Sequence, residues 1–407
     1  MSTKRLATRI EQAAESATLA IDAIAKSMIA GGVDVVSFAA GEPDFPTPGF
    51  IVDAAIEAAR DPRNHRYTAA GGLPELRAAI AEVTKRDAGL EVTADQVVVT
   101  NGGKHAIYEV LMTLIDEGDE VLIPAPYWVS YPEVVKLAGG VPVAIPTGLS
   151  AGFKVTPEDV ERYYTERTKM FIHVSPSNPT GATYTRAESE ALAATLDRLG
   201  LFVMSDEIYQ HLTYSGTGPG ERATSLGEVA SPSLIERMVL VNGVSKTFSM
   251  TGWRLGWSVA PADIAKGMVK LQSQLTSNVA NVSQRAALAA VRADLGETAY
   301  MREAFFRRRS AIVSGLAGIP GFDVAWPDGA FYAFPSVAGV IGRRYHGSPV
   351  ASSMSFAELL LSEARVAVVP GEAFDAPGYL RLSYALGDDR IVEGISRISE
   401  FVAKLEP

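Results

Sequence analysis

Short runs of apolar, β-branched residues recur through the middle of this 407-residue chain, and each run ends in small or polar residues. Examples are "DQVVVTNGG", "DEVLIPAPYW", "KMFIHVSPSNPTG", "LFVMSDEIY" and "RMVLVNGVSK". Strands without polar alternation are buried on both faces, and strands that alternate with helices favour a mostly parallel sheet. The pattern therefore predicts an α/β fold in which amphipathic helices such as "PGFIVDAAIEAARD" and "AESEALAATLDRLG" cover both faces of the sheet.

The length of the chain and a change of pattern along it predict two domains. We expect a large α/β domain over residues 47–310, because the alternating pattern fills this region. The later strands are short and irregular, so residues 311–407 together with 1–46 are expected to form a smaller α+β domain. The segment "GRRYHGSP" near Arg343 is expected to be a flexible loop.

The composition excludes several classes of function. The chain has no cysteine, which excludes disulfides, thiolate metal ligands and a cysteine nucleophile, and its five histidines lack metal-ligand spacing. Its net charge of −10 is spread without charged blocks, so neither nucleic acid nor an anionic membrane is an expected partner. The N-terminus lacks the pattern of a secretory signal, and no run reaches the ~20 apolar residues of a membrane span. We therefore expect a cytoplasmic protein without a metal site.

Polar residues gather where the predicted strands end, and this is where ligands bind in open parallel sheets. In "TNGGKHAIY" two glycines precede a helix, so the amide of Gly103 and the helix N-terminus could bind a phosphate, with Lys104 adding positive charge. The same residues also suit an ordinary strand-to-helix turn. Trp128, at the next strand end, could stack on a flat ring or belong to the core.

Two further strand ends carry an amide and a carboxylate. Asn178 lies in "SPSNPTG", which is typical of a turn but could also hydrogen-bond a ring hydroxyl. Asp206 ends a wholly apolar strand and is either a helix cap or the partner of a cationic group such as a protonated pyridine nitrogen. In "VSKTFSMTGWRLGW" the amine of Lys246 follows another apolar strand, although lysine is rarely buried unless paired. By itself the segment favours a surface lysine whose amine reaches solvent, and a buried reactive amine is the alternative. Together these strand ends favour one cofactor site.

The motif series resembles the class I aminotransferases, which are pyridoxal 5'-phosphate enzymes of fold type I. The resemblance rests, in order along the chain, on "AAGEPDFPTP", "RYTAAGGLPELR", "NGGKHAIY", "PAPYWVSYP", "SPSNPTG", "SDEIY", "VSKTFSMTGWRLGW", "PDGAFYAFP", "VVPGEAF" and "LRLSYA". Within this family the chain is most similar to bacterial aspartate aminotransferases that begin with a "SATLAIDA" helix.

The resemblance implies a role for each residue around the cofactor ring. Lys246 would hold the cofactor as a Schiff base and then move the proton at the substrate Cα. Asp206 would pair with the pyridine nitrogen and keep it protonated. Tyr209 and Asn178 would hydrogen-bond the phenolic oxygen, and Trp128 would stack on the ring. Trp128 and Asn178 would also border the substrate.

The resemblance also implies how the phosphate is bound. The amides of Gly103 and Lys104 and the planar guanidinium of Arg254 would bind it. Many relatives carry a serine phosphate ligand three residues before the lysine, where this chain has Gly243. Ser245, next to the lysine, is therefore the candidate from this segment.

Subunit and substrate contacts follow from the same resemblance. Tyr67 would reach the phosphate of a neighbouring subunit, so a homodimer with shared active sites is expected. Arg381 would bind the substrate α-carboxylate, with the backbone of Gly41 beside it. Lys104, aided by the hydroxyls of Ser16 and Thr18, would bind the second carboxylate of a dicarboxylic substrate. His105 stands where relatives often carry glutamine, and both a structural role and a substrate contact are open for it.

The reaction expected from these roles is transfer of the amino group of L-aspartate to 2-oxoglutarate, giving oxaloacetate and L-glutamate. Aromatic amino acids, kynurenine or prephenate are alternative substrates. A pyridoxal-phosphate β-lyase would share every cofactor residue. A transcription regulator built on this fold would need a DNA-binding module, and the residues before "VVSFAAGEPDF" contain no helix-turn-helix pattern.

Overall fold

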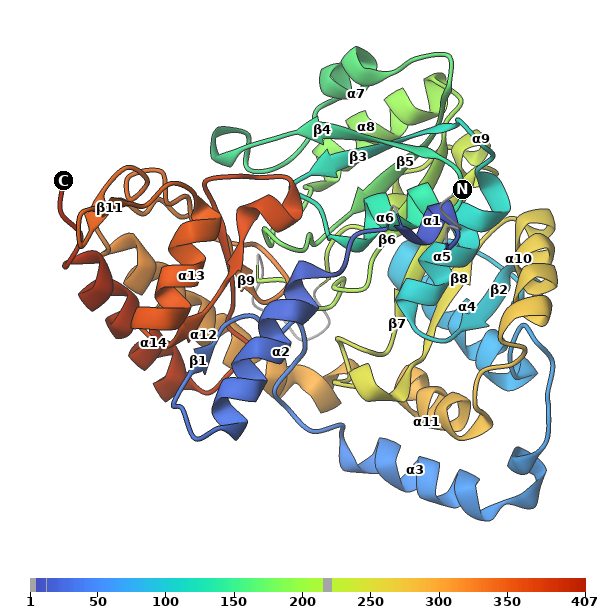
Figure 1. Cartoon of the computed structure of the whole chain (residues 1–407). Coiled ribbons are helices and arrows are strands. Elements are labelled where there is room, and N and C mark those ends of the chain that lie inside the picture. Colours follow the sequence, from blue (N-terminus) through green and yellow to red (C-terminus); the bar gives the residue numbers. More distant parts are fainter. Residues whose placement is uncertain (1–4, 12, 215–221) are drawn as a thin grey trace.

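The computed structural model describes residues 5–11, 13–214 and 222–407. One part is built on a large sheet, and a second part gathers the C-terminal elements with the N-terminal helix α2 (Ala17–Ala30) beside them (Figure 1). In the described part of the chain, no helix is both long and apolar enough to cross a membrane.

The large sheet has seven strands, and its order explains where loops collect. Its strand order is β2-β8-β7-β6-β5-β3-β4. Only β8 runs antiparallel to its two neighbours, and every other pair is parallel, which confirms the mostly parallel sheet. The strands are β2 (Val97–Thr100), β3 (Glu120–Ala125), β4 (Val141–Pro146), β5 (Thr168–Val174), β6 (Phe202–Asp206), β7 (Met238–Gly243) and β8 (Gly256–Val259).

Successive strand residues point into two different cores, one on each face of the sheet. In β5, Met170 and Ile172 pack into one core and Phe171 into the other, and all three are fully buried. The first face is covered by α5 (Gly103–Leu114), α6 (Ser130–Leu137) and α10 (Ala262–Leu275). The second is covered by α3 (Gly49–Arg60), α4 (Pro74–Ala88), α7 (Pro157–Tyr163), α8 (Arg186–Arg198), α9 (Pro232–Ile235) and α11 (Asn281–Arg292). Burial on both faces is why these strands carry no polar alternation.

A further core joins the two ends of the chain. The helices α12 (Ala299–Ala317), α13 (Ser353–Glu363) and α14 (Asp388–Val402) pack with an antiparallel sheet of β9 (Tyr332–Ala333), β13 (Val369–Pro370) and β14 (Leu380–Ser383). Near the N-terminus, β1 (Val36–Ser37) pairs in parallel with β12 (Val366–Ala367), and α2 packs beside β12. The short helix α1 (Thr8–Glu11) precedes α2. The division at residues 46 and 310 stays a prediction.

The segment "GRRYHGSP" differs from its predicted form. It contains β10 (Arg344–Tyr345) and β11 (Ser348–Pro349), which pair antiparallel. His346 and Gly347 connect them with φ angles of 48° and 76°. A two-residue hairpin turn with both φ angles positive matches the twist of the strands. The prediction of a loop is therefore wrong here, because the turn uses histidine where asparagine is more typical.

Glycine at β8 allows the start of α5 to approach the sheet closely. A Cβ atom on Gly256 would lie 2.5 Å from the backbone nitrogen of Gly103 and 2.7 Å from the carbonyl carbon of Gly102. Gly243, on the neighbouring strand, is similarly confined, since its Cβ would lie 3.0 Å from the Cα of Gly256. The approach of α5 thus depends on the absence of a side chain at Gly256, and the absence of one at Gly243 allows β7 to pack closely on β8.

We predict that Gly256→Ala lowers the free energy of unfolding by about 1–3 kcal/mol, because the added methyl group overlaps backbone atoms that must move. Chemical denaturation of the variant and the parent measures the difference. Gly252→Ala is the matched control, since a Cβ there has no heavy atom within 4 Å, and it should change stability by less than about 0.5 kcal/mol. Equal stabilities for the two variants would contradict the close approach.

Candidate active site

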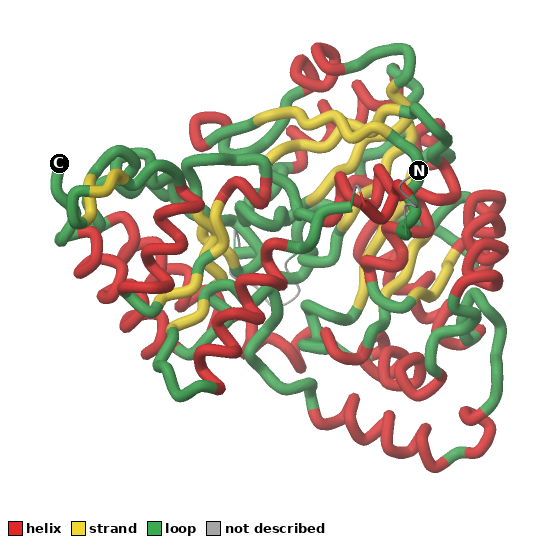
Figure 2. The backbone as a smooth tube through the Cα atoms, in the orientation of Figure 1, coloured by secondary structure: helices red, strands yellow, loops and turns green. Residues whose placement is uncertain are grey.

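The loops that follow the parallel strands meet between the large sheet and the C-terminal elements (Figure 2). Asp206 is the last residue of β6, and Lys246 lies three residues beyond the end of the adjacent strand β7. The amide of Glu207 donates to the carbonyl oxygen of Val241 at 2.9 Å, so the two strand ends stay paired. The sheet therefore brings the predicted carboxylate and the predicted amine to the same edge.

The amine of Lys246 is enclosed by backbone and aromatic groups. Its Nζ atom donates to the carbonyl oxygen of Gly41 at 2.6 Å and lies 5.8 Å from the ring centre of Tyr209 and 5.9 Å from that of Phe331. Burial lowers the pKa of Lys246 to about 8, although the nearby carboxylate of Glu42 opposes the change. Near pH 7 the neutral fraction of this amine is therefore much larger than that of an ordinary lysine, which makes it a usable nucleophile and base.

The carboxylate of Asp206 is 4% exposed and is held from two sides. It accepts hydrogen bonds from the hydroxyl of Tyr131 at 2.7 Å and from the amide of Ile208 at 3.2 Å. Burial raises the pKa of Asp206, and these two hydrogen bonds oppose the increase. Tyr131 was not predicted from the sequence, although its spacing of three residues from Trp128 was a possible signal. The rings of Tyr131 and Trp128 meet edge to face at 5.4 Å.

A second group of side chains connects Tyr209 to Arg381. The hydroxyls of Tyr209 and Tyr332 are hydrogen-bonded at 2.8 Å, and the Arg381 guanidinium lies 4.7 Å from the ring centre of Tyr332. Arg381 donates to the side-chain oxygen of Asn178 at 3.1 Å and to the carbonyl oxygen of Ala39 at 2.7 Å. Tyr332 was also missed from the sequence, because an aromatic residue in an apolar run is typical of a core.

The Arg381 side chain retains a donor that no described residue accepts. The residue is 2% exposed, and its buried Nε atom has no hydrogen-bond partner in the part of the chain that the structure describes. Burial lowers the pKa of Arg381, but a guanidinium remains charged in proteins. A buried cation with a free donor fits a carboxylate ligand.

The start of α5 forms an anion cradle with Arg254. Gly102 precedes the helix with φ 89°, and a Cβ there would lie 2.7 Å from the Nη2 atom of Arg254. The guanidinium donates to the carbonyl oxygens of Thr251 at 2.9 Å and Asn101 at 3.4 Å. It therefore lies directly over the helix N-terminus, where free amides and the helix dipole attract anions. The amide of Gly103 is at this N-terminus, as predicted from the sequence.

Lys104 contacts Trp128 and also lines an open cavity beside the cradle. The Lys104 amine lies 4.8 Å from the ring centre of Trp128. Burial lowers the pKa of Lys104, and the positive charge of Arg254 lowers it further. Lys104 and Ser16 line the same cavity of about 530 Å³, together with Glu133. The hydroxyls of Ser16 and Thr18 are hydrogen-bonded to each other at 3.0 Å.

His105 stabilises the turn that precedes α5. Its Nδ1 atom accepts the amide hydrogen of Asn101 at 3.3 Å, and its Nε2 atom lies 3.4 Å from the fully buried carboxyl of Glu109. Burial lowers the pKa of His105 and raises that of Glu109 to about 8. These contacts favour the structural role over the substrate contact.

Two of the predicted residues stand apart from these networks in the single chain. Tyr67 is 91% exposed. Ser245 is buried beside Lys246, and its carbonyl oxygen accepts the amide of Met250 at 3.1 Å. A serine at Gly243 would bring its Cβ within 3.0 Å of the carbonyl oxygen of Leu255, which gives a steric reason for glycine there.

The donor set fits pyridoxal 5'-phosphate in its chemistry. The partly buried amine of Lys246, with its lowered pKa, suits an aldehyde. The buried carboxylate of Asp206 suits a protonated ring nitrogen, and the cradle at α5 suits a phosphate. Among the described residues, no group of three or more histidine, aspartate or glutamate side chains could hold a metal ion.

The family model described as "Aminotransferase class I and II" matches residues 33–398. The chain is 53% identical over 401 residues to an aspartate aminotransferase of Streptomyces avermitilis, covering 98% of this chain and 97% of that protein. It is 44% identical over 395 residues to an aspartate/prephenate aminotransferase of Cereibacter sphaeroides, covering 96% of each. A solved aspartate aminotransferase structure from Rhizobium meliloti has a TM-score of 0.94 at 38% identity, covering 99% of this chain and 100% of that one. These similarities confirm the predicted fold type.

We predict that the environment of Lys246 makes the free energy of unfolding change with pH in the alkaline range. With a native pKa of about 8 against an ordinary 10.5, the native lysine binds fewer protons than the unfolded one between these values. Stability relative to a Lys246→Met variant should therefore rise from pH 8 to 10.5 and stay constant below pH 8.

Denaturation of both cofactor-free proteins across this pH range measures the effect. In the cofactor-free parent protein, the rate at which a chemical reagent labels the Lys246 amine should reach half of its maximum near pH 8. A midpoint near 10.5 would show that the amine is solvated.

Proposed function

The chain belongs to the class I and II aminotransferases and is a pyridoxal-phosphate-dependent enzyme, and from this premise we propose that it transfers the amino group of L-aspartate to 2-oxoglutarate. The products would be oxaloacetate and L-glutamate. The observation that carries the proposal is the buried Arg381 with its free Nε donor beside the Lys246 amine, because a substrate α-carboxylate and its amino group need these two partners. The Streptomyces avermitilis relative, 53% identical, is named an aspartate aminotransferase.

Pyridoxal 5'-phosphate, when bound, supplies the aldehyde and the electron-withdrawing ring that amino-group transfer requires. The cradle of Gly103, Lys104 and Arg254 would bind its phosphate, since the guanidinium lies over the helix N-terminus. Ser245 would add a contact next to Lys246.

The side chains around the ring have separate tasks. Asp206, whose carboxylate accepts the hydroxyl hydrogen of Tyr131, would pair with the protonated ring nitrogen. Trp128 would cover one ring face, while Tyr209 and Asn178 would donate to the phenolic oxygen. These roles use groups that are already oriented by neighbouring side chains, so little ordering accompanies binding.

Proton transfer at the substrate would fall to Lys246. Its Nζ atom would accept the proton from the substrate Cα and return a proton in the second half of the reaction, which suits a pKa of about 8. Arg381 would bind the α-carboxylate, with Asn178 fixing the guanidinium plane and the backbone of Gly41 beside it. Trp128 and Asn178 would also border the substrate.

The second carboxylate of aspartate or 2-oxoglutarate would bind Lys104. The supporting observation is that Lys104 and Ser16 line the same open cavity, where a cation and a hydroxyl can meet a carboxylate. Prephenate is the second candidate acceptor, because the Cereibacter sphaeroides relative is named an aspartate/prephenate aminotransferase. The cytoplasmic location stays a prediction.

We also infer a homodimer with shared active sites. The support is the 91% exposure of Tyr67, which is unusual for an aromatic side chain of this size. In the dimer, Tyr67 of one subunit would reach the phosphate bound by the other.

We predict that the purified enzyme with pyridoxal 5'-phosphate converts L-aspartate and 2-oxoglutarate to equal amounts of oxaloacetate and L-glutamate. The kcat/KM for aspartate should exceed that for phenylalanine by at least about tenfold, because Lys104 would remain unpaired with an apolar substrate. Coupled assays with each amino acid, and with prephenate as acceptor, give the ranking. If, without an acceptor, an amino acid that carries a β-leaving group is converted to pyruvate, ammonia and the released β-substituent, the β-lyase alternative is supported instead.

A mixture of two inactive variants tests the shared site. Tyr67→Ala and Lys246→Ala subunits should each have low activity alone. After dissociation and re-association of a one-to-one mixture, each hybrid dimer would contain one intact site, so roughly a quarter of parental activity should return. No recovery, with hybrid dimers shown to have formed, would mean that Tyr67 does not contribute across subunits.

A further inference from the structure

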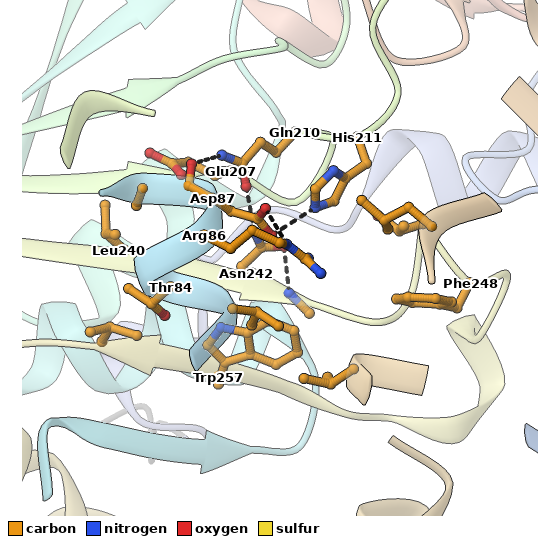
Figure 3. A pocket seen from close by; sticks show the side chains of 17 residues that line it. Thr84, Arg86, Asp87, Glu207, Gln210, His211, Leu240, Asn242, Phe248 and Trp257 are labelled. Carbon is orange, nitrogen blue, oxygen red and sulfur yellow. Dashed lines mark hydrogen bonds and ion pairs between the residues drawn. The ribbon is translucent and has the colours of Figure 1, made fainter. Parts of the chain in front are cut away.

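The segments that carry Asp206 and Lys246 have a second side that faces away from the candidate active site. There they line a small cavity of about 50 Å³, drawn in Figure 3. Glu207, Gln210 and Asn242 border this cavity. The two segments thus lie between the candidate active site on one side and a group of polar side chains on the other.

Gln210 connects both segments. It is 2% exposed, and its Nε2 atom donates to the carbonyl oxygen of Asp87, near the end of α4, at 2.9 Å. Its Oε1 atom accepts from the Nδ2 atom of Asn242, in β7, at 3.4 Å. The turn after β6 is therefore joined to α4 on one side and to the end of β7 on the other (Figure 3).

Backbone groups fix the orientation of both amides. The carbonyl oxygen of Asp87 can only accept, so the amino end of Gln210 must face it. The amide of Gly243 can only donate, and it donates to the Oδ1 atom of Asn242 at 2.8 Å. The amino end of Asn242 therefore faces the carbonyl end of Gln210, and the link between them is matched in only one way.

The next residue strengthens the connection to α4. His211 contacts the Asp87 carboxylate through Nε2 at 3.1 Å, and Arg86 donates to the same carboxylate twice at 2.7 Å. Burial opposes ionisation of Asp87, but the hydrogen bonds from Arg86 and His211 outweigh it and lower its pKa. The end of α4 thus holds two consecutive residues of the turn that follows Asp206 and Tyr209.

We propose that Gln210 is a positioning residue that sets the separation between Asp206 and Lys246 by joining the turn after β6 to Asn242 and to α4. The proposal rests on the proposed function, since that function requires both groups to meet one cofactor. Gly103, Lys104 and Arg254, which form most of the proposed phosphate site, lie in α5 and in the segment of Arg254, and among the described residues the side chains of Gln210 and Asn242 make no hydrogen bond to them. Ser245 is the one proposed phosphate contact on the segment after β7. Loss of the link should therefore affect the ring end of the cofactor much more than the phosphate end.

The test compares cofactor and phosphate affinity in the full-length chain. Gln210→Met keeps length and volume but removes both hydrogen bonds, and Asn242→Ala removes the link from the other end. Thr84→Val is the matched control, because Thr84 is buried and lines the same cavity, and among the described residues its hydroxyl bonds only to Ile80 within α4 at 2.8 Å. Calorimetry of the cofactor-free proteins gives affinities for pyridoxal 5'-phosphate and inorganic phosphate, and steady-state kinetics give kcat and KM.

Gln210→Met should weaken pyridoxal 5'-phosphate binding by at least about tenfold and lower kcat by a similar factor, because small displacements of reacting groups are costly. Its phosphate affinity and its KM for aspartate should stay within about twofold of the parent. The double variant with Asn242→Ala should be no worse than the more affected single variant, as expected for two residues in one link. In Thr84→Val, the affinities for pyridoxal 5'-phosphate and phosphate, the kcat and the KM for aspartate should all stay within about twofold of the parent values.

Three results would overturn the positioning role. They are unchanged cofactor affinity, parallel loss of cofactor and phosphate affinity, and additive effects in the double variant. If Gln210→Met does not fold, the comparison of Asn242→Ala with Thr84→Val decides in the same way. A parent protein that binds the cofactor but does not transaminate aspartate contradicts the proposed function instead, and the affinity comparison still tests the link.

Discussion

The partly buried amine of Lys246 and the buried guanidinium of Arg381 hydrogen-bond to the backbone carbonyls of Gly41 and Ala39, which belong to one short segment after β1. A carbonyl oxygen satisfies a donor but does not neutralise a charge, and unbalanced charge is costly in a low-dielectric interior. The amine responds with a lowered pKa, whereas the guanidinium cannot lose its proton. The site is thereby built to attract anionic groups, and it keeps its lysine ready for proton transfer.

This arrangement depends on three distant regions of the chain. The segment of residues 39–41 follows β1, Lys246 follows β7, and Arg381 lies within β14. The carbonyl oxygen of Phe38 also accepts the amide of Ser383, so the segment is tied to the strand that carries Arg381. The N-terminal region therefore completes a site whose chemistry comes from the large sheet and from the C-terminal elements.

The sequence predicts the main features of the site because apolar strands end abruptly. Asp206, Lys246 and Gly103 were recognised at such ends, and the sheet brings them to one edge. Tyr131 and Tyr332 could not be recognised in this way, since an aromatic residue in an apolar stretch looks like part of a core. Their hydroxyl partners are far away in the sequence, and only the folded chain brings them together.

Other features depend on close contacts that no local pattern reveals. The steric reason for Gly243 lies in a neighbouring strand, and the hairpin at His346 depends on two positive φ angles. Gln210 looks like a solvated turn residue in the sequence, yet it is almost fully buried.

The geometry around Gln210 also bears on how this region can change during evolution. Asp87 offers Gln210 only its backbone carbonyl, so the identity of residue 87 is uncoupled from that of residue 210. Residues 210 and 242 meet through side chains that must match as donor and acceptor, and residues 87 and 211 meet as a carboxylate and an imidazole. Among related sequences, positions 210 and 242 should consequently covary with each other, and positions 87 and 211 should covary separately, although all four positions line one small cavity.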